Sequence, residues 1–554
     1  MEPDLTGPNF LSTKFENDIA RQEATESTRR DAVRHGAPGS SWLRFAVPSV
    51  ADLVFVLLLV ALSWGTLSKA LLGDAGIGWH IRTGELILST HAIPRVDPFS
   101  SVMRGQPWYA WEWFYDGIVG VLHGVAGLNG VVLFSATVIA LTFALVYRKM
   151  IESGAQLPVA VVMLLLVFAA SSIHFLARPH VLSWLFVVMW FGFLERFEAD
   201  GNWRRLAWLP ALMVLWVNVH GGFLLGLALL GIYFVSALLS AWVWQGSEER
   251  DRAFGRARIL AAVATASTVV TLANPFGYKL HVHICRYLSD RFLMDHIDEF
   301  LSPNFHGFPQ KCFAVIVLFA VAAMAGSRKH FRLSHLLVVL FAIYSGLYAS
   351  RNIPPSAILL TLIAAPQLSM AFSEAAGNRD VSELWRNRLA RFDRFGSKMV
   401  DLDRGLSGHV WPALALLVLV WACAHQGYIG TNHVLDAHFD DKRFPVDAVD
   451  VLASGQSRGS VFCPDKWGGY VIYRLYPKTL VAVDDRHDLY GTAFLKRYLK
   501  IVHGEPGWDG ELMAMHADWV LVPADSTMAS ILSGSAGWKI AYRDDVAALF
   551  AGQP

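Results

Sequence analysis

The chain has 554 residues, of which 54% are hydrophobic and only 17% are charged. In soluble domains roughly a quarter of the residues are charged, so this composition excludes an ordinary soluble protein. It indicates a polytopic membrane protein that also has a water-soluble part. The formal net charge of +1, without a dense basic run, argues against nucleic acid as a partner. The four cysteines, Cys285, Cys312, Cys423 and Cys463, have no metal-like spacing and give no disulfide framework.

The N-terminal residues 1–45 are polar, rich in Glu, Arg, Ser and Thr, and contain no short apolar run ending in a cleavage signature. A segment of this composition cannot bury enough apolar surface to fold. We therefore predict a disordered cytoplasmic tail, followed by a first membrane helix that acts as an uncleaved anchor.

Long apolar segments follow this tail. A helix needs about 20 mostly apolar residues to cross the hydrocarbon core of a bilayer. Spans are predicted at roughly 47–72, 129–147, 157–175, 181–197, 207–219, 222–244, 258–274, 311–326, 334–349, 354–372 and 409–426. Residues 113–127 are ambiguous, because this Gly-rich stretch is short and is interrupted by Asp116 and His123.

The basic residues of the loops decide how this stretch is interpreted. If 113–127 lies in the membrane interface, one face of the membrane receives the tail and the basic clusters at 148–149, 204–205, 250–258, 328–332 and 373–408. The positive-inside rule makes that face cytoplasmic, whereas a spanning segment would move several clusters outside. We therefore predict a transmembrane domain at 46–426, with an interfacial helix in a first external loop at 73–128.

After residue 426 the composition becomes that of a soluble domain. Strands are predicted at 459–463, 479–484, 519–523 and 538–542, with helices at 466–476 and 492–503 between them. Alternating strands and helices predict a small α/β domain at 427–554, external by the same count of spans. The predicted fold class is thus an α-helical polytopic membrane protein of about 11–12 spans with a small C-terminal α/β periplasmic domain.

The unusual polar motifs all fall on the predicted external face. They lie in the loop at 73–113 and at 177–180, 218–222, 274–277, 296–300 and 350–354. Ionisable groups at the edge of a membrane bundle are costly unless they are paired or functional. Six such clusters on one side predict one shared cavity.

Three carboxylates of the first external loop are the candidate catalytic residues. Asp74 follows the first span, where it can act as the general base when an acceptor attacks an activated donor sugar, although it can also simply cap a helix. Glu112 stands among tryptophans, and burial there would raise its pKa. Asp97 lies between Pro94 and Pro98, which also fits a turn.

Arginine forks match phosphate oxygens, so Arg178 and Arg351 are candidates to hold a lipid phosphate, with snorkelling to the interface as the alternative. Two further turns of the C-terminal domain follow strands, where α/β domains bind ligands, although capping and salt bridging explain them as well. The candidate substrate-binding residues are His80, Arg178, His180, Asn218, His220, Arg351, Asn352, Trp467, Tyr470, Asp485 and Arg486. Imidazole and carboxylate groups can bind a divalent metal, but no His-Glu-x-x-His spacing occurs, so the cofactor stays unknown.

These features resemble the GT-C superfamily of membrane glycosyltransferases, which use lipid-phosphate-linked sugars. The resemblance lies in an acidic residue just after the first membrane helix, a long first external loop, about a dozen spans and an external C-terminal domain. Asp74 matches the acidic residue of the family, and the resemblance implies a catalytic or acceptor-orienting role for it. The common Asp-x-Asp or Asp-x-Glu form is absent, because Gly76 stands two residues after Asp74.

The stretch Trp467-Gly-Gly-Tyr470 looks distantly like the tryptophan motif of oligosaccharyltransferase catalytic subunits, but it lacks the paired tryptophans and the central aspartate. The combined pattern is also similar to uncharacterised bacterial proteins of the superfamily, in which this stretch and the turn at 484–491 recur. The resemblance implies a multi-pass inner-membrane enzyme that moves a sugar from a polyprenyl-phosphate donor to a lipid, glycan or protein acceptor on the periplasmic face. A lipid-linked glycan polymerase or ligase, a transporter and a non-enzymatic assembly subunit remain alternatives. Membrane lipids are further partners, and the oligomeric state stays undetermined.

Overall fold

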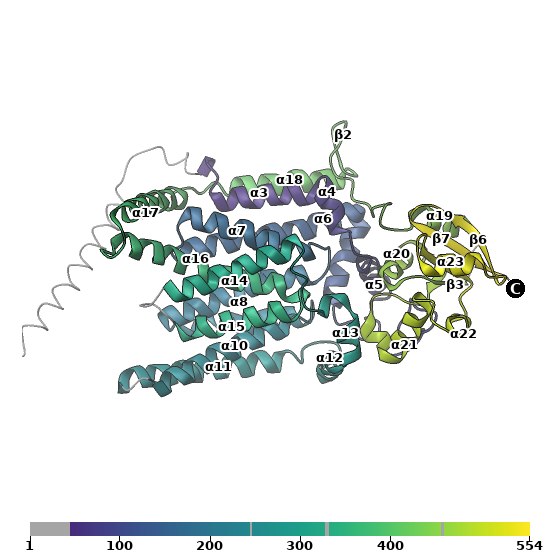
Figure 1. Cartoon of the computed structure of the whole chain (residues 1–554), viewed down its shortest axis with the longest axis horizontal. Coiled ribbons are helices and arrows are strands. Elements are labelled where there is room, and N and C mark those ends of the chain that lie inside the picture. The colour runs from purple at the N-terminus through teal and green to yellow at the C-terminus, as the bar shows by residue number, and fades with distance from the viewer. Residues whose placement is uncertain (1–44, 244–245, 327–331, 456–458, 554) are drawn as a thin grey trace, which may run out of the picture.

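The computed structural model describes residues 45–243, 246–326, 332–455 and 459–553. Long apolar helices form a bundle, and a small α/β domain sits at one end of it (Figure 1). The predicted fold class is thereby confirmed. The predicted cytoplasmic tail lies outside the described residues, apart from its last residue.

All eleven predicted spans are helical. The first is broken at Gly65, whose φ of 74° separates α3 (Val50–Ser63) from α4 (Thr66–Leu71). The other helices of the bundle are α6 (Trp113–Glu152), α7 (Leu157–Ser171), α8 (His180–Asp200), α9 (Trp208–Val217), α10 (Phe223–Val243), α11 (Ser247–Val270), α14 (Phe308–Gly326), α15 (Leu333–Tyr348), α16 (Ile353–Gly377) and α18 (Val410–Ala424). Among the described residues, seven helices are long and apolar enough to cross a membrane, and three shorter helices are also apolar.

Helix α6 contains the ambiguous stretch 113–127. Its backbone breaks at Gly127, with φ of 58° and ψ of −152°, two residues before the predicted span begins. The part before the break packs against α5 (Gly76–Thr90) of the first loop. Gly84 and Gly120 let the two backbones touch, since a Cβ on Gly84 would lie 1.9 Å from the carbonyl oxygen of Asp116. The first third of α6 therefore packs with the loop, and its place in the membrane interface stays a prediction.

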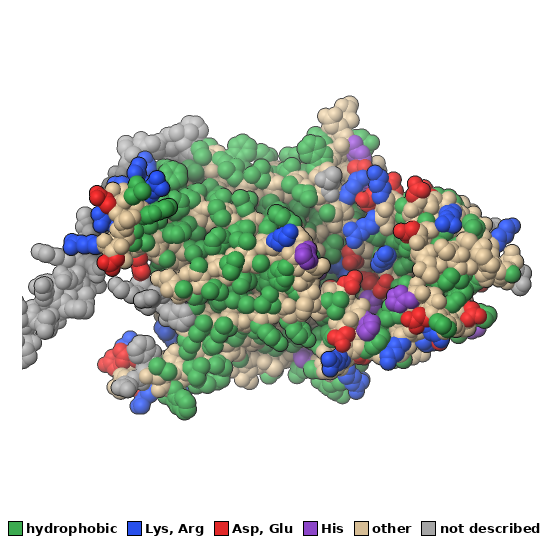
Figure 2. Space-filling view, viewed as in Figure 1, with side chains coloured by type: hydrophobic (Ala, Val, Ile, Leu, Met, Phe, Trp, Pro, Cys, Tyr) green, Lys and Arg blue, Asp and Glu red, His purple; other side chains and the backbone are tan. Residues whose placement is uncertain are grey.

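Shorter helices lie at both ends of the bundle. On the side of the α/β domain, α12 (Tyr278–Ser289) and α13 (Arg291–His296) connect α11 to α14. At the opposite end, the Arg-rich α17 (Glu383–Arg404) packs on α16 and α7 (Figure 1). The flank of the bundle is mostly hydrophobic, whereas charged and histidine side chains gather over its junction with the α/β domain (Figure 2).

The α/β domain is built on a five-stranded sheet of order β4 (Thr479–Val481), β3 (Gly459–Phe462), β5 (Trp519–Pro523), β7 (Ala547–Gly552) and β6 (Trp538–Arg543). Strands β4, β3 and β5 are parallel, and β7 pairs antiparallel with both β5 and β6. Its helices are α19 (Val446–Ser454), α20 (Asp465–Leu475), α21 (His487–Val502), α22 (Trp508–Ala514) and α23 (Thr527–Ser533). A small hairpin, β1 (Tyr428–Ile429) and β2 (Asn432–His433), precedes the domain.

The domain is attached to the first loop through backbone contacts. Helix α20 crosses α5 very closely. A Cβ on Gly469 would lie 2.2 Å from the carbonyl oxygen of Ala75, and a Cβ on Gly78 would lie 2.2 Å from the carbonyl oxygen of Gly469. The first loop also extends the sheet, because the Ser101 amide donates to the carbonyl oxygen of Val481 across 2.7 Å. The domain and the loop therefore form one layer over the end of the bundle.

Candidate active site

Arg178 lies where the bundle, the first loop and the α/β domain meet. It sits between α7 and α8, and the neighbouring Ala177 amide donates to the carbonyl oxygen of Leu71 across 2.7 Å. The guanidinium Nη1 lies 3.3 Å from Asp74 Oδ2, and Nη2 lies 2.8 Å from Asp485 Oδ2. The other oxygen of Asp74 accepts from the Gly76 amide at 2.7 Å, which fixes the carboxylate. The structure thus brings together three residues that the sequence predicts for the site.

Gly76 makes room for this arrangement. A Cβ at this position would lie 2.6 Å from Arg178 Nη2 and 2.6 Å from Asp485 Oδ2. The second oxygen of Asp485 accepts from Trp79 Nε1 at 2.8 Å. Burial raises the pKa of Asp485, against the opposing effect of Arg178. Gly76 therefore lets Asp485 of the α/β domain reach the guanidinium that Asp74 also contacts.

Glu112 lies between two imidazoles next to this group. Its Oε2 is 3.7 Å from His80 Nε2, and its Oε1 is 3.9 Å from His220 Nε2. Both separations exceed a direct hydrogen bond, so these atoms are available to a substrate group. Burial raises the pKa of Glu112 to about 8, which keeps this carboxyl group mostly protonated at neutral pH.

The hydrogen bonds define the state of the histidines. His220 Nδ1 accepts from the Gly222 amide at 3.0 Å and lies 2.8 Å from Ser183 Oγ, so its ring proton is on Nε2 and faces Glu112. Burial lowers the pKa of His220 to about 3, so the ring is neutral. His80 Nδ1 lies 2.6 Å from Asp116 Oδ1, and burial lowers the pKa of His80 as well.

Two further predicted residues, Arg351 and His180, border the same region. Arg351 pairs with Glu299 at 3.1 Å, and its guanidinium carbon lies 4.5 Å from the ring centre of Phe300. Burial raises the pKa of Glu299, but Arg351 and Arg178 outweigh this effect and bring it down to about 2. His180 Nε2 is 2.8 Å from the carbonyl oxygen of His174, and its ring centre is 6.4 Å from that of His220.

Two predicted asparagines are occupied by structural hydrogen bonds. Asn218 accepts from Trp113 Nε1 and donates to the carbonyl oxygens of Val214 and Ala273, each at 2.8 Å. Asn352 donates to the carbonyl oxygen of Ser345 at 3.2 Å. Asn218 therefore joins α6, α9 and the end of α11, and it positions the neighbouring His220 rather than offering its amide to a ligand.

Asp97 and Arg486 lie apart from this group, in a buried ion cluster. Arg486 Nη1 is 2.8 Å from Asp97 Oδ1, and Nη2 is 2.7 Å from Asp484 Oδ2. The second oxygen of Asp97 accepts from the Ser100 amide at 2.8 Å. Only 1% of Asp97 and 3% of Arg486 is exposed. The structure therefore places both residues in a buried ion cluster, and the catalytic role expected for Asp97 and the binding role expected for Arg486 stay predictions.

Trp467 and Tyr470 are also core residues. Trp467 Nε1 donates to the carbonyl oxygen of Arg443 at 3.1 Å. The Tyr470 ring packs between Phe439 and Phe444, and only 1% of the residue is exposed. The conspicuous Trp-Gly-Gly-Tyr stretch thus serves the crossing of α20 over α5, which differs from the expected contact with substrate.

The structure adds polar residues that sequence reasoning did not assign. Ser183 holds His220 from inside an apolar helix and gives no sequence signal. Asp116 was visible only as an interruption of an apolar stretch, and it orients His80. His283 pairs with Asp488 at 3.0 Å and stacks on Tyr109, with ring centres 4.4 Å apart. Within the described ranges, the carboxylates and histidines around Glu112 do not converge on a single metal-sized point.

No protein-family model matches the sequence, and no curated protein does either. Solved structures do match its fold. The oligosaccharyltransferase of Archaeoglobus fulgidus, tethered to an acceptor peptide, gives a TM-score of 0.51 at 12% identity, over 91% of this chain and 73% of that one. ArnT from Cupriavidus metallidurans gives 0.48 at 14% identity, over 91% and 96% of the two chains. The chain thus shares the fold of this oligosaccharyltransferase.

Proposed function

We propose that the protein is a glycosyltransferase of the bacterial inner membrane, which transfers a sugar from a polyprenyl-phosphate donor to a lipid, glycan or protein acceptor on the periplasmic face. The pairing of Arg178 with Asp74 and Asp485 carries this proposal. It places a phosphate-binding cation beside carboxylates, at one end of a fold shared with an oligosaccharyltransferase.

The orientation rests on charge. The Arg-rich α17 lies at the end of the bundle away from the α/β domain (Figure 1), with which Arg178 pairs through Asp485, and basic segments mark the cytoplasmic side of membrane proteins. The candidate site then faces the periplasm.

In the proposed reaction the acceptor oxygen attacks the anomeric carbon of the donor sugar. The bond between that carbon and the phosphate oxygen breaks, and its electron pair leaves with the phosphate. Arg178 stabilises the charge that develops on the departing phosphate, with Arg351 as a second cation on the same side. Asp74 takes the proton of the acceptor, because its carboxylate is partly exposed, with 29% of the side chain accessible.

Glu112 has a complementary task in this scheme. Its raised pKa leaves it protonated at neutral pH, whereas Asp74 is held as an ion pair with Arg178. A carboxyl group that stays protonated near an ion-paired carboxylate suits acid and base chemistry. We assign Glu112 as the donor of a hydrogen bond or a proton to the oxygen that becomes negative, with His220 at its side.

The test uses the purified full-length protein in its native lipid extract. Polyprenyl-phosphate sugars are added one at a time, and release of polyprenyl phosphate is followed by mass spectrometry. Asp74→Asn keeps the shape of the residue but removes the base, so release should fall by at least about 100-fold, as for loss of a general base. Asp436→Asn is the matched control, because that carboxylate is 64% exposed and far along the chain. Equal release by wild type and Asp74→Asn would overturn the assignment of the base, and no release from any donor would overturn the proposed activity.

A further inference from the structure

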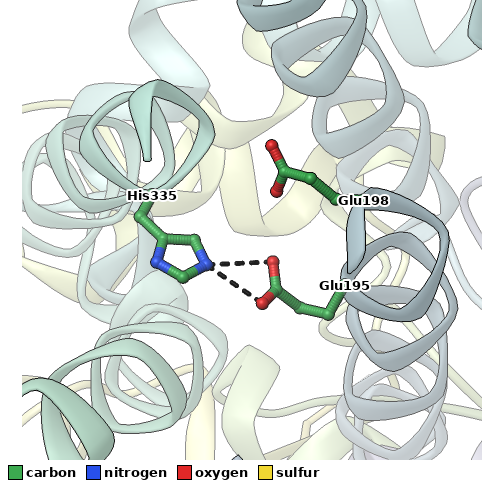
Figure 3. Close-up of side chains that lie close together, drawn as sticks. All are labelled: Glu195, Glu198 and His335. Atoms are coloured by element: carbon green, nitrogen blue, oxygen red, sulfur yellow. Dashed lines mark hydrogen bonds and ion pairs between the residues drawn. The ribbon is translucent and has the colours of Figure 1, made fainter. Parts of the chain in front are cut away.

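A second group of ligating side chains lies inside the bundle. Glu195 and Glu198 stand one turn apart on α8, and His335 lies in the first turn of α15 and faces them (Figure 3). His335 Nε2 is 3.0 Å from each carboxylate oxygen of Glu195. One donor atom from each of the three residues lies within 4.8 Å of the others. The arrangement can therefore place three ligand atoms around one ion.

This group is separate from the candidate active site. His180 begins α8 beside Arg178, and Glu195 follows about 22 Å further along the helix at 1.5 Å per residue. The two groups thus occupy opposite ends of the same span. The proposed sugar transfer at the other end of α8 therefore does not explain the presence of Glu195 and Glu198 here.

The charges of the group are not balanced. The side chains of Glu195 and Glu198 are only 23% and 20% exposed. The nearest guanidinium, that of Arg332, lies 3.4 Å from Glu195 and 3.9 Å from Glu198, and it is 43% exposed. This half-exposed guanidinium is shared between two carboxylates, and buried carboxylates are costly unless they are paired or coordinate a metal.

Neighbouring hydroxyl groups hold the carboxylates in place. Tyr233 on α10 donates to Glu195 Oε1 at 2.5 Å, and Ser334 donates to Glu198 at 2.7 Å. Such outer hydrogen bonds orient ligand carboxylates in metal sites. Glu198 has no bond to His335, so its carboxylate points into the space between the two helices (Figure 3).

A cavity lies beside Glu198, one of the three residues. It has a volume of about 270 Å³ and lies between α8, α10 and α11. Glu198 and Tyr233 line it, and Ser236, Ser240, Glu249, Arg252 and Arg256 complete its polar wall. An ion can therefore reach Glu198 without the helices moving apart.

From this geometry we propose that Glu195, Glu198 and His335 bind one divalent transition-metal ion of the zinc class. The imidazole favours such an ion over Mg²⁺ or Ca²⁺, which prefer oxygen ligands alone. Three protein ligands leave a fourth position for water from the cavity. The ion would replace the contact between His335 and Glu195 with a stronger link and fasten α8 to α15 at the end of the bundle away from Arg178.

The experiment titrates ZnCl₂ into the full-length protein, first stripped with a chelator and held in lipid nanodiscs. Bound zinc per chain is measured by mass spectrometry after dialysis, and thermal unfolding is followed with and without zinc. Glu198→Gln and His335→Gln each remove one ligand. Glu198→Gln leaves the pair of Glu195 with His335 intact, so it should fold even if His335→Gln does not. Glu152→Gln is the control, because Glu152 is an exposed carboxylate near the same end of the bundle.

The wild type and Glu152→Gln should bind one zinc more per chain than either ligand variant, or bind it at least about tenfold more tightly. Zinc should raise their unfolding temperature more than that of the variants, and Co²⁺ in its place should show the visible absorption of a four-coordinate site. Zinc bound at other histidines is common to all variants and cancels in the comparison. Equal stoichiometry, affinity and stabilisation in wild type and Glu198→Gln would overturn the proposal and leave the group as an ion-pair network.

Discussion

Asp485 of the α/β domain and Arg178 of the bundle form an ion pair of 2.8 Å across 307 residues of sequence. Because Asp74 contacts the same guanidinium, the first loop and the C-terminal domain both anchor the cation that we assign to the donor phosphate. A phosphate that binds there must compete with two carboxylates. The cation is thereby held in position before the substrate arrives, which lowers the cost of organising the site during the reaction.

Arg178→Lys should raise the KM for the donor by about 10- to 100-fold, because charge-assisted hydrogen bonds to a phosphate contribute about 1.5–3 kcal/mol and a lysine cannot make two parallel ones. Arg351→Lys should have a smaller effect, since Arg351 is engaged with Glu299 and the Phe300 ring. Initial rates at varied donor concentration give the KM of both variants. A larger change in Arg351→Lys would assign the phosphate to the other arginine.

The activity should also depend on the protonation of Glu112. Its pKa is about 8, so the protonated form dominates below that pH and disappears above it. If the protonated form is the active one, kcat should fall as the pH rises through about 8. Glu112→Gln cannot ionise, so its remaining activity should lack this decline while being lower at neutral pH. Rates between pH 6 and 10 test this, and an unchanged decline in Glu112→Gln would assign the titration to another group.

The sequence predicts the bundle well because the length of an apolar helix is a local signal. The same holds for the strands that alternate with helices, whereas β7 was missed because residues 547–550 are all buried and show no alternation. The site depends on contacts between distant segments. The sequence predicts Asp74 and Arg178 as separate site residues. Their contact with Asp485 depends on the space that Gly76 leaves open, and no pattern of neighbouring residues reveals that contact. For the same reason the sequence of the Trp-Gly-Gly-Tyr stretch predicts a ligand-binding turn but does not reveal the helix crossing that its glycines allow.

That crossing gives a prediction about stability. Gly469→Ala puts a Cβ 2.2 Å from the backbone oxygen of Ala75, so α20 must move away from α5. Overpacking of this kind costs about 1–3 kcal/mol. Gly510→Ala is the matched control, because nothing lies within 4 Å of its Cβ in the exposed α22, and alanine favours a helix by about 0.5–1 kcal/mol. Thermal unfolding should therefore shift down in the first variant and stay or rise in the second. Equal shifts would contradict the close contact between the two helices.

Asp97→Asn distinguishes the structural role of this residue from the catalytic role that the sequence suggested. The substitution removes one of the two carboxylates that neutralise the buried Arg486, which keeps only Asp484. A buried charge with an incomplete set of partners costs about 1–3 kcal/mol, so the variant should unfold at a lower temperature than the wild type. Its activity per folded molecule should remain that of the wild type, because Asp97 lies outside the group around Arg178. Comparing the unfolding temperature with the rate of polyprenyl phosphate release in one preparation separates the two roles. A variant that is as stable as the wild type but inactive would show that Asp97 has a catalytic role.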